Sequence, residues 1–466
     1  MRIGAHHALL VGACVLGACS ADRLEVPNYN QPTPDGAAAA PLVALAQASS
    51  GLLTQVRALW GFGNSPVSQF ALYGREAFLY TAQEGRNTTG YLVTPNENTS
   101  FGVGTFAGYY TLRRNANNFY NILESAAASL TPQQAAASRG FAKTLEGWDM
   151  LVYIMSRHDL GGAVEQTSDP TFIAPFVPRD SVYSWAVNRL ADGLTDLQAG
   201  GSAFPFSLTA GFTGFNTPTT FTKFNRAVAA RALAYRGSLS TGAARTQFYQ
   251  QALTALQGSF VSTTDGMEVG VYQVFSTAAG EVINGINSTS NLDFVAHPSI
   301  VTDAEAGDRR LAAKTKTITR KNPPVPNAIS TTVGFNRYPV QTSPIPIIKN
   351  AELVLLRAEA RYFTGDKAGA LTDVNYVRTT DGSLTALAAG DIDTDDKFIT
   401  RLLYERRYSL LIEGHRWVDV RRFGKLSTLP LDHSTHVRAS QMVVPQQECD
   451  SRTNTGDAAL KAPSCP

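Results

Sequence analysis

The stretch LLYERRYSLLIEGHRWVDVRRFGKL, from Leu402 to Leu426, is the most informative segment of this chain. Leu403, Leu410 and Trp417 recur at intervals of seven residues, a pattern that predicts an apolar helical seam with charges on its flanks. Six lysine and arginine residues stand beside three acids in this segment. Because an unpaired charge is costly to bury next to large apolar groups, we expect each acid to pair with a guanidinium group.

Two hypotheses account for the acids of this segment. Glu413 and Asp419, together with His415, form a conceivable acid/base set of an enzyme. The alternative is a set of structural ion pairs that joins the last helical hairpin to its neighbours. We favour the structural hypothesis, because pairing with a guanidinium group lowers the pKa of a carboxyl group, whereas a general acid needs a raised pKa.

The same segment closely resembles the C-terminal signature of the SusD/RagB family of outer-membrane nutrient-binding lipoproteins, a pattern of the form E-R-x-x-E-L-x-x-E-G-x-R-W-x-D-L-x-R-W-G. The residues that carry the resemblance are Glu405, Arg406, Glu413, Gly414, Arg416, Trp417, Asp419, Arg422, Phe423 and Gly424. Ser409 stands where the family usually has an acid. We expect a structural ion-pair motif formed by Glu405, Arg406, Glu413, Arg416, Asp419 and Arg422.

The N-terminal residues predict a lipoprotein signal. Arg2 gives a positive start, and the apolar run Ala8–Gly17 suits a signal peptide and is too short to span a bilayer. Cys19 follows Leu-Gly-Ala, the order of a lipobox. We predict a signal peptide over residues 1–18, lipidation of Cys19 and an extended tether over residues 19–40; plain signal-peptide cleavage is the alternative. Acyl chains on Cys19 would anchor the protein stably, because each buried methylene contributes about 0.8 kcal/mol.

Two further cysteines, Cys449 and Cys465, lie 16 residues apart near the C-terminus. In an oxidising compartment they can close a small loop, and a disulfide there would stabilise the fold by about 3 kcal/mol. The alternative is a pair of free thiols on a loose tail. Two cysteines without a nearby histidine are too few ligands for a metal site.

Composition and motifs exclude several classes of function. Charged residues make up 17% of the chain and the formal net charge is +2, so there is no basic field for nucleic acid. The sequence has no nucleophile elbow, no phosphate-binding glycine loop and no histidine and cysteine cluster at metal-ligand spacing. We expect a non-catalytic protein without cofactor or metal. An all-helical glycoside hydrolase and a tetratricopeptide scaffold that recruits proteins are the alternatives from other classes.

Helical periodicity dominates the rest of the chain. Helices are predicted at Leu42–Trp60, Tyr110–Ala128, Ala135–Met155, Ser181–Leu197, Arg226–Leu239 and Phe248–Leu256. Ala358 and Ala370, twelve residues apart within 351–377, indicate a helical hairpin with the spacing of tetratricopeptide repeats, and this hairpin resembles the family's own unit. Further hairpins are expected near residues 105–160, 224–258 and 400–424.

Long segments between the helices are rich in glycine, threonine, asparagine and proline. They are residues 83–105, 200–223 and 259–340, with weak strand patterns at Val269–Tyr272 and Thr331–Tyr338. The prediction is a mainly α, SusD-like fold, in which tetratricopeptide-like hairpins form a scaffold with long irregular loop insertions and a few short strands. We expect an N-terminal helical region with ligand loops at residues 41–222 and a C-terminal region with the hairpins at residues 223–466.

The resemblance also implies a function. Members of the family sit on the cell surface over a SusC-like TonB-dependent transporter, capture oligosaccharides, or peptides in the RagB branch, and deliver them to it. We therefore expect an outer-membrane, lipid-anchored protein that faces the cell exterior and captures oligosaccharides, with peptides or other organic nutrients as the alternative. Our candidate ligand residues mix rings with hydrogen-bonding groups in loop-like segments. They are Tyr73, Tyr80, Arg86, Asn87 and Tyr91, with Phe294 and His297 as weaker candidates.

Overall fold

The computed structural model describes residues 39–60, 65–81, 84–167, 169, 171–322 and 329–466. The predicted signal peptide, Cys19 and residues 20–38 of the predicted tether lie outside these residues. Within the described part of the chain, no helix is both long enough and apolar enough to span a membrane.

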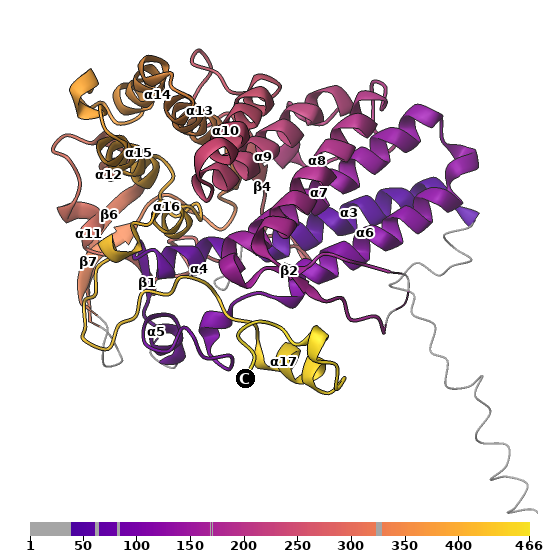
Figure 1. The fold of residues 1–466 in the computed structure, drawn as a ribbon, viewed down its shortest axis with the longest axis horizontal. Coiled ribbons are helices and arrows are strands. Elements are labelled where there is room, and N and C mark those ends of the chain that lie inside the picture. Colours follow the sequence, from indigo (N-terminus) through magenta and orange to yellow (C-terminus); the bar gives the residue numbers. More distant parts are fainter. Residues whose placement is uncertain (1–38, 61–64, 82–83, 168, 170, 323–328) are drawn as a thin grey trace, which may run out of the picture.

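Helices form most of the described chain, so the prediction of a mainly α fold is confirmed (Figure 1). The helices are α3 (Pro41–Trp60), α4 (Pro66–Tyr73), α5 (Arg86–Leu92), α6 (Ala107–Ser125), α7 (Pro132–Arg157), α8 (Arg179–Gln198), α9 (Pro218–Ser238), α10 (Gly242–Gln257), α11 (Ser299–Thr302), α12 (Arg309–Lys314), α13 (Asn350–Phe363), α14 (Lys367–Thr380), α15 (Asp395–Ser409), α16 (Arg416–Arg422) and α17 (Gln446–Thr453). From α6 to α10, and again from α13 to α15, each helix packs against the next in the chain. The helical hairpins therefore form one continuous scaffold.

Among the described residues the strands are few and short, as predicted, and they form four antiparallel pairs. The pairs are β1 (Ala77–Leu79) with β5 (Phe294–Ala296), β2 (Gly162–Ala163) with β3 (Phe176–Val177), β4 (Gly270–Gln273) with β8 (Ile345–Lys349), and β6 (Thr315–Lys321) with β7 (Thr331–Phe335). β4 and β7 correspond to the two weak strand patterns of the sequence.

Helices lie in all three segments that the sequence predicted as loops, and α11 and α12 are within residues 259–340. α5 occupies part of residues 83–105, and α9 begins at Pro218, well before the expected start at Arg226. At α9 the side chain of Thr217 accepts a hydrogen bond from the backbone N–H of Thr220. The side chain of Thr220 in turn accepts one from the backbone N–H of Thr217. A capping box followed by proline at the first helical position is a strong start signal, which outweighs the polar composition of this segment.

The predicted seven-residue seam does not form one continuous helix. α15 ends at Ser409 and α16 begins at Arg416. Between them Ile412 and Gly414 have φ angles of 50° and 83°, which the right-handed helix cannot accommodate. Leu410 therefore packs in the smaller core cluster around α13 to α15, whereas Trp417 packs in the main core.

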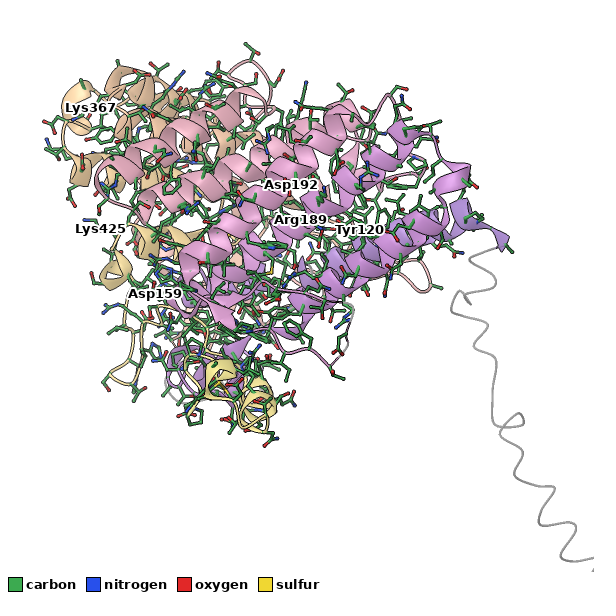
Figure 2. The ribbon with its side chains drawn as sticks, turned by 45° about the vertical axis from the view of Figure 1, so that its right-hand side comes forward. Tyr120, Asp159, Arg189, Asp192, Lys367 and Lys425 are labelled. Atoms are coloured by element: carbon green, nitrogen blue, oxygen red, sulfur yellow. A yellow bond between two sulfur atoms is a disulfide. The ribbon has the colours of Figure 1, made fainter. Side chains whose placement is uncertain are left out.

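The main core contains residues from both predicted regions, 41–222 and 223–466, so the boundary between them stays a prediction. Polar contacts also connect neighbouring helices. Figure 2 shows Tyr120 of α6 and Arg189 of α8, which meet at the buried Glu146 of α7. The Tyr120 hydroxyl donates to Glu146 Oε2 at 2.7 Å, and Arg189 Nη2 donates to the same oxygen at 2.6 Å.

Candidate ligand-binding site

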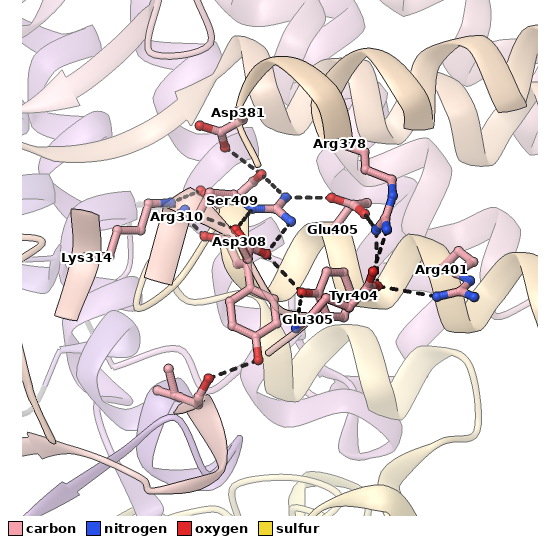
Figure 3. A network of polar contacts seen from close by, with 12 residues as sticks. Glu305, Asp308, Arg310, Lys314, Arg378, Asp381, Arg401, Tyr404, Glu405 and Ser409 are labelled. Atoms are coloured by element: carbon pink, nitrogen blue, oxygen red, sulfur yellow. Dashed lines mark hydrogen bonds and ion pairs between the residues drawn. The ribbon is translucent and has the colours of Figure 1, made fainter. Parts of the chain in front are cut away.

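The C-terminal charged segment forms a buried network around Glu405 of α15 (Figure 3). Glu405 accepts hydrogen bonds from Arg310 at 2.6 Å and from Arg378 at 2.9 Å. Ser409, at the position where the family usually has an acid, accepts from Arg310 at 2.9 Å and donates to Asp381 at 2.7 Å. The serine thus connects the arginine to a carboxylate supplied by another part of the chain.

The other residues of the predicted ion-pair motif join different elements. Arg406 donates to Asp419 at 2.7 Å, and Arg422 of α16 donates to Asp419 at 3.0 Å. Glu413 accepts hydrogen bonds from Arg337 and Lys349. Arg416 donates to the backbone oxygen of Gly74 at 3.0 Å. Each of the three acids therefore contacts a guanidinium group, and the contacts join α15 and α16 to the rest of the fold.

Burial and pKa argue against an acid/base role for these groups. Glu413, His415 and Asp419 are 3%, 5% and 2% exposed. Burial disfavours ionisation of Asp419, but Arg406 and Arg422 outweigh it and hold the pKa of Asp419 below its ordinary value. At Glu405 the balance is reversed: burial outweighs the arginines and raises the pKa, so the expectation that pairing lowers it is wrong there. Among the described residues, no group of histidines, cysteines and acids is arranged to hold a metal ion.

Three of the predicted ligand residues lie in the core, away from the two pockets described below. Tyr73 is 1% exposed, stacks on Trp417 with ring centroids 4.7 Å apart, and donates its hydroxyl to Gly102 O at 2.6 Å. Tyr80 is buried and stacks on Phe78. Phe294 is buried against Phe335. In this conformation none of these rings offers a face to a ligand.

The other three predicted residues lie around α5. Asn87 is buried and donates to the Thr81 hydroxyl. Arg86 is exposed, pairs with Glu84, and places its guanidinium 4.3 Å from the ring centre of Phe101. Tyr91 is buried, accepts a hydrogen bond from Gln69, and lines a pocket together with Phe101. His297, also a weaker candidate, is buried, and its Nε2 lies 3.1 Å from Oδ2 of Asp432.

A pocket of about 470 Å³, here called the α6 pocket, lies between the first turns of α6, the loop that joins β2 to β3, and α17. Its aromatic residues are Phe106, Tyr110 and Phe172, and Phe172 is 38% exposed. Its charged residues are Arg113, Arg114, Glu165, Asp169, Glu448 and Arg452, three of each sign. The pocket therefore combines an accessible ring with many hydrogen-bonding groups and a balanced charge.

Two arginines hold the walls of the α6 pocket in place. Arg113 donates to Ala163 O at 2.9 Å and to Val164 O, which fixes the start of the β2–β3 loop on α6. Arg452 donates to Ala174 O at 2.9 Å, which fixes the end of that loop on α17. Because buried backbone oxygens need partners, these contacts set the position of the loop that carries Phe172.

A second pocket, here called the amide pocket, has a volume of about 680 Å³ and lies beside the α6 pocket; Phe106 and Ala107 line both. Its side-chain amides are Gln69, Asn98, Gln446 and Gln447, and its hydroxyl groups belong to Tyr91, Thr99, Ser100 and Thr105. None of the described residues that line it is charged. Such a surface suits a neutral ligand rich in hydroxyl groups.

Reasoning from the sequence missed most of both pockets. One usable signal was Phe172, a lone aromatic residue in a polar segment between two short strands. The contribution of α17 had no comparable signal, because Gln447 and Phe106 are far apart in the chain and only the fold brings them to one surface.

The architecture defines the protein as a helical-hairpin scaffold that carries pockets on its loops, and comparison with known proteins gives its family. A model of the SusD family matches residues 308–460. This match confirms the resemblance to the SusD/RagB family that the C-terminal signature indicated. A comparison with curated proteins found no match.

Solved structures show the same fold over most of the chain. NanU of B. fragilis is 15% identical with a TM-score of 0.65, and the likeness covers 93% of this chain and 99% of NanU. Surface glycan-binding protein A from Bacteroides uniformis is 14% identical with a TM-score of 0.67, covering 91% and 100%. Surface glycan-binding protein A from Bacteroides thetaiotaomicron, solved in complex with laminarihexaose, is 12% identical with a TM-score of 0.65, covering 91% and 99%.

Proposed function

We propose that this protein is a non-catalytic, lipid-anchored protein of the outer cell surface that captures oligosaccharides and delivers them to a SusC-like TonB-dependent transporter. The match to the SusD family model supports this role. Two of the similar folds belong to proteins described as surface glycan-binding proteins. The observation that carries the proposal is the α6 pocket, in which the exposed ring of Phe172 lies among hydrogen-bonding side chains.

The chemistry of this pocket matches that of a sugar. A pyranose ring has apolar C–H faces and a rim of hydroxyl groups. The ring of Phe172 offers apolar area for the face, as aromatic side chains do in binding sites generally. Glu165, Gln166 and Asp169 lie in the same wall and accept hydrogen bonds from hydroxyl groups.

Capture of peptides is the second candidate function. The charged side chains of the α6 pocket favour it, because Arg114 can pair with a peptide carboxylate and Glu165 or Asp169 with an ammonium group. Neutral oligosaccharides remain the preferred ligand, since the adjoining amide pocket has no described charged residue in its lining.

Isothermal titration calorimetry of the full-length chain in detergent tests the function. A panel of neutral oligosaccharides and a peptide mixture serve as ligands, and chromatography of each mixture tests for cleavage. We expect binding of at least one glycan class without product. The Phe172→Ala variant should bind at least about tenfold more weakly, a loss of about 1.4 kcal/mol.

Leu42→Ala serves as the matched control, because Leu42 is also a large exposed apolar residue and lies on α3, outside both pockets. It should bind like the wild type. Binding of peptides alone would move the assignment to peptide capture. Cleavage of a bound glycan would contradict the non-catalytic role.

The transporter is the partner that the family implies. Co-expression with a SusC-like transporter, followed by purification through a tag on the transporter, tests this part of the proposal. We expect the two chains to co-elute in detergent. Elution of the transporter without this protein would contradict a stable complex while leaving glycan capture intact.

A further inference from the structure

We propose that the two pockets form one groove for a linear, uncharged oligosaccharide, and that the amide pocket discriminates against charged glycans. This inference rests on the proposed function, because it names the ligand class of the same site. It is carried by two observations, the adjacency of the pockets and the distribution of charge along them.

The pockets adjoin at the start of α6. Phe106 and Ala107 line both, and α17 forms part of the wall of each. Gln447 of α17 lies in the amide pocket, whereas Glu448 and Ser451 lie in the α6 pocket. Each volume alone, about 680 and 470 Å³, already falls in the range of about 300–1,000 Å³ that pockets for single small ligands occupy. A chain of linked units is therefore the form of ligand that fills both.

The charge changes along this groove. The α6 pocket has three acids and three arginines, so a charged ligand group finds a partner there. The described lining of the amide pocket has amides, hydroxyl groups and apolar side chains, and no charged group. A carboxylate or sulfate bound there would lose hydration without meeting a charged group in the lining: Arg86, which lies on the ring of Phe101, is already paired with Glu84, and Arg157 donates to the backbone of the wall. This loss is unfavourable, whereas sugar hydroxyl groups exchange hydrogen bonds with water for bonds to amides. The amide pocket therefore selects neutral units.

The wall of the amide pocket is fixed from behind. Arg157 of α7 is buried and donates to Val103 O and Thr105 O, both at 2.7 Å. The guanidinium N–H groups of Arg157 are therefore directed at the backbone of the wall and not at a ligand. On the opposite side, Asn98 Nδ2 donates to Val444 O at 2.6 Å, just before α17. A wall held in this way needs little ordering when a ligand binds.

The decisive experiment compares two ligands that differ only in charge. A neutral hexasaccharide that binds in the panel is titrated into the full-length chain beside the same hexasaccharide with its primary hydroxyl groups oxidised to carboxylates. We expect oxidation to weaken binding at least about tenfold. The Gln447→Lys variant, which places a positive charge at the amide pocket, should regain most of the affinity for the oxidised hexasaccharide.

Gln250→Lys is the matched control, because it introduces the same charge at an exposed glutamine of α10, outside both pockets. It should bind both ligands like the wild type. The Phe172→Ala variant should weaken the neutral hexasaccharide more than the corresponding disaccharide, since only the longer ligand must occupy both pockets.

The outcomes separate this inference from the proposed function. Equal affinity for the neutral and oxidised hexasaccharides, or a Gln447→Lys variant that behaves like Gln250→Lys, would overturn the inference and leave glycan capture standing. A loss in Phe172→Ala that is the same for disaccharide and hexasaccharide would overturn the continuous groove. Absence of binding by any neutral glycan would overturn both.

Discussion

Arg310 of α12 and Glu405 of α15 form a buried ion pair, in which Nη1 of the arginine lies 2.6 Å from Oε2 of the glutamate and both side chains are at most 1% exposed (Figure 3). Arg378 of α14 contacts the other oxygen of the same carboxylate at 2.9 Å. One carboxylate therefore connects three helices of the C-terminal half. Ser409, one turn further along α15, extends the connection from Arg310 to Asp381.

Removing the shared carboxylate should destabilise the fold. We expect Glu405→Ala to lower the free energy of unfolding by about 1.5–3 kcal/mol, because it removes charge-assisted hydrogen bonds from two buried arginines, which keep Asp308 and Glu305 as their other carboxylate partners. Urea denaturation measures the change. Asp393→Ala removes the exposed pair with Lys397 and should leave the stability close to that of the wild type. Similar stability for the two variants would contradict a structural role for Glu405.

Glu76, directly before β1, should make stability depend on pH. It is buried, and burial raises its pKa from 4.5 to about 8 despite the nearby Arg416 and Arg407. Between these two values the unfolded chain releases the proton and the folded chain keeps it. The contribution of Glu76 to stability therefore falls as the pH rises from about 4.5 to about 8, by up to about 1.4 kcal/mol per pH unit.

The Glu76→Gln variant tests this dependence, because glutamine has the same shape and does not titrate. Relative to the wild type, its stability should increase through this pH window and then level off. Urea denaturation of both proteins at a series of pH values between about 4 and about 9 measures the difference in their free energies of unfolding. This difference should depend on pH, because proton binding is linked to folding. A difference that does not vary with pH would show that Glu76 keeps an ordinary pKa.

The disulfide between Cys449 and Cys465 should stabilise both the fold and the groove. The two Cα atoms are 5.3 Å apart and the bond closes a loop that begins within α17. We expect the Cys449→Ser and Cys465→Ser double variant to lose about 3 kcal/mol of stability. It should also bind glycans more weakly, because α17 forms a wall of both pockets.

Thermal unfolding and calorimetry of the double variant, beside the wild type with and without reductant, measure these effects. Electrophoretic mobility after thiol alkylation establishes the state of the two cysteines. Unchanged glycan affinity in a less stable variant would show that the disulfide supports the fold and not the groove.

Cys19 should determine whether the protein is attached to the membrane. We expect Cys19→Ala to move the protein from the membrane fraction to the soluble fraction, because acyl chains on this residue are the predicted anchor. Fractionation followed by immunoblotting measures the distribution, and labelling with palmitate tests for the lipid. Retention of the variant in the membrane fraction would point to an anchor other than this lipid.

Local patterns predicted much of the scaffold. The apolar period over Ala135–Met155 became α7, and the alanine spacing within residues 351–377 became the α13–α14 hairpin. Periodicity suffices here because a helix with one apolar face can bury it against almost any neighbour. The sequence predicted the hairpin near residues 400–424 but not the position of its turn, since the apolar interval of seven continues across Ile412 and Gly414, where the backbone turns.

The ligand residues were harder to predict, and the aromatic candidates show why. Tyr73 precedes Gly74, Arg75 and Glu76, and Phe294 lies in a segment predicted as a loop, which favours an exposed position. Tyr73 nevertheless stacks on Trp417, and Phe294 packs on Phe335, because other parts of the chain cover them. Whether a ring faces a ligand or the core depends on what the remainder of the chain places over it.

The sequence by itself determined the mainly helical scaffold, the family and the set of charges in the C-terminal segment, because these follow from residue order over short stretches. Only the tertiary structure decided which charge pairs with which and where the groove lies. Glu405 meets Arg310, and Gln447 meets the start of α6 near Phe106, across long separations in the chain. The physical reason is that ion pairs and pockets depend on distances in space, and the packing of the helices sets these distances.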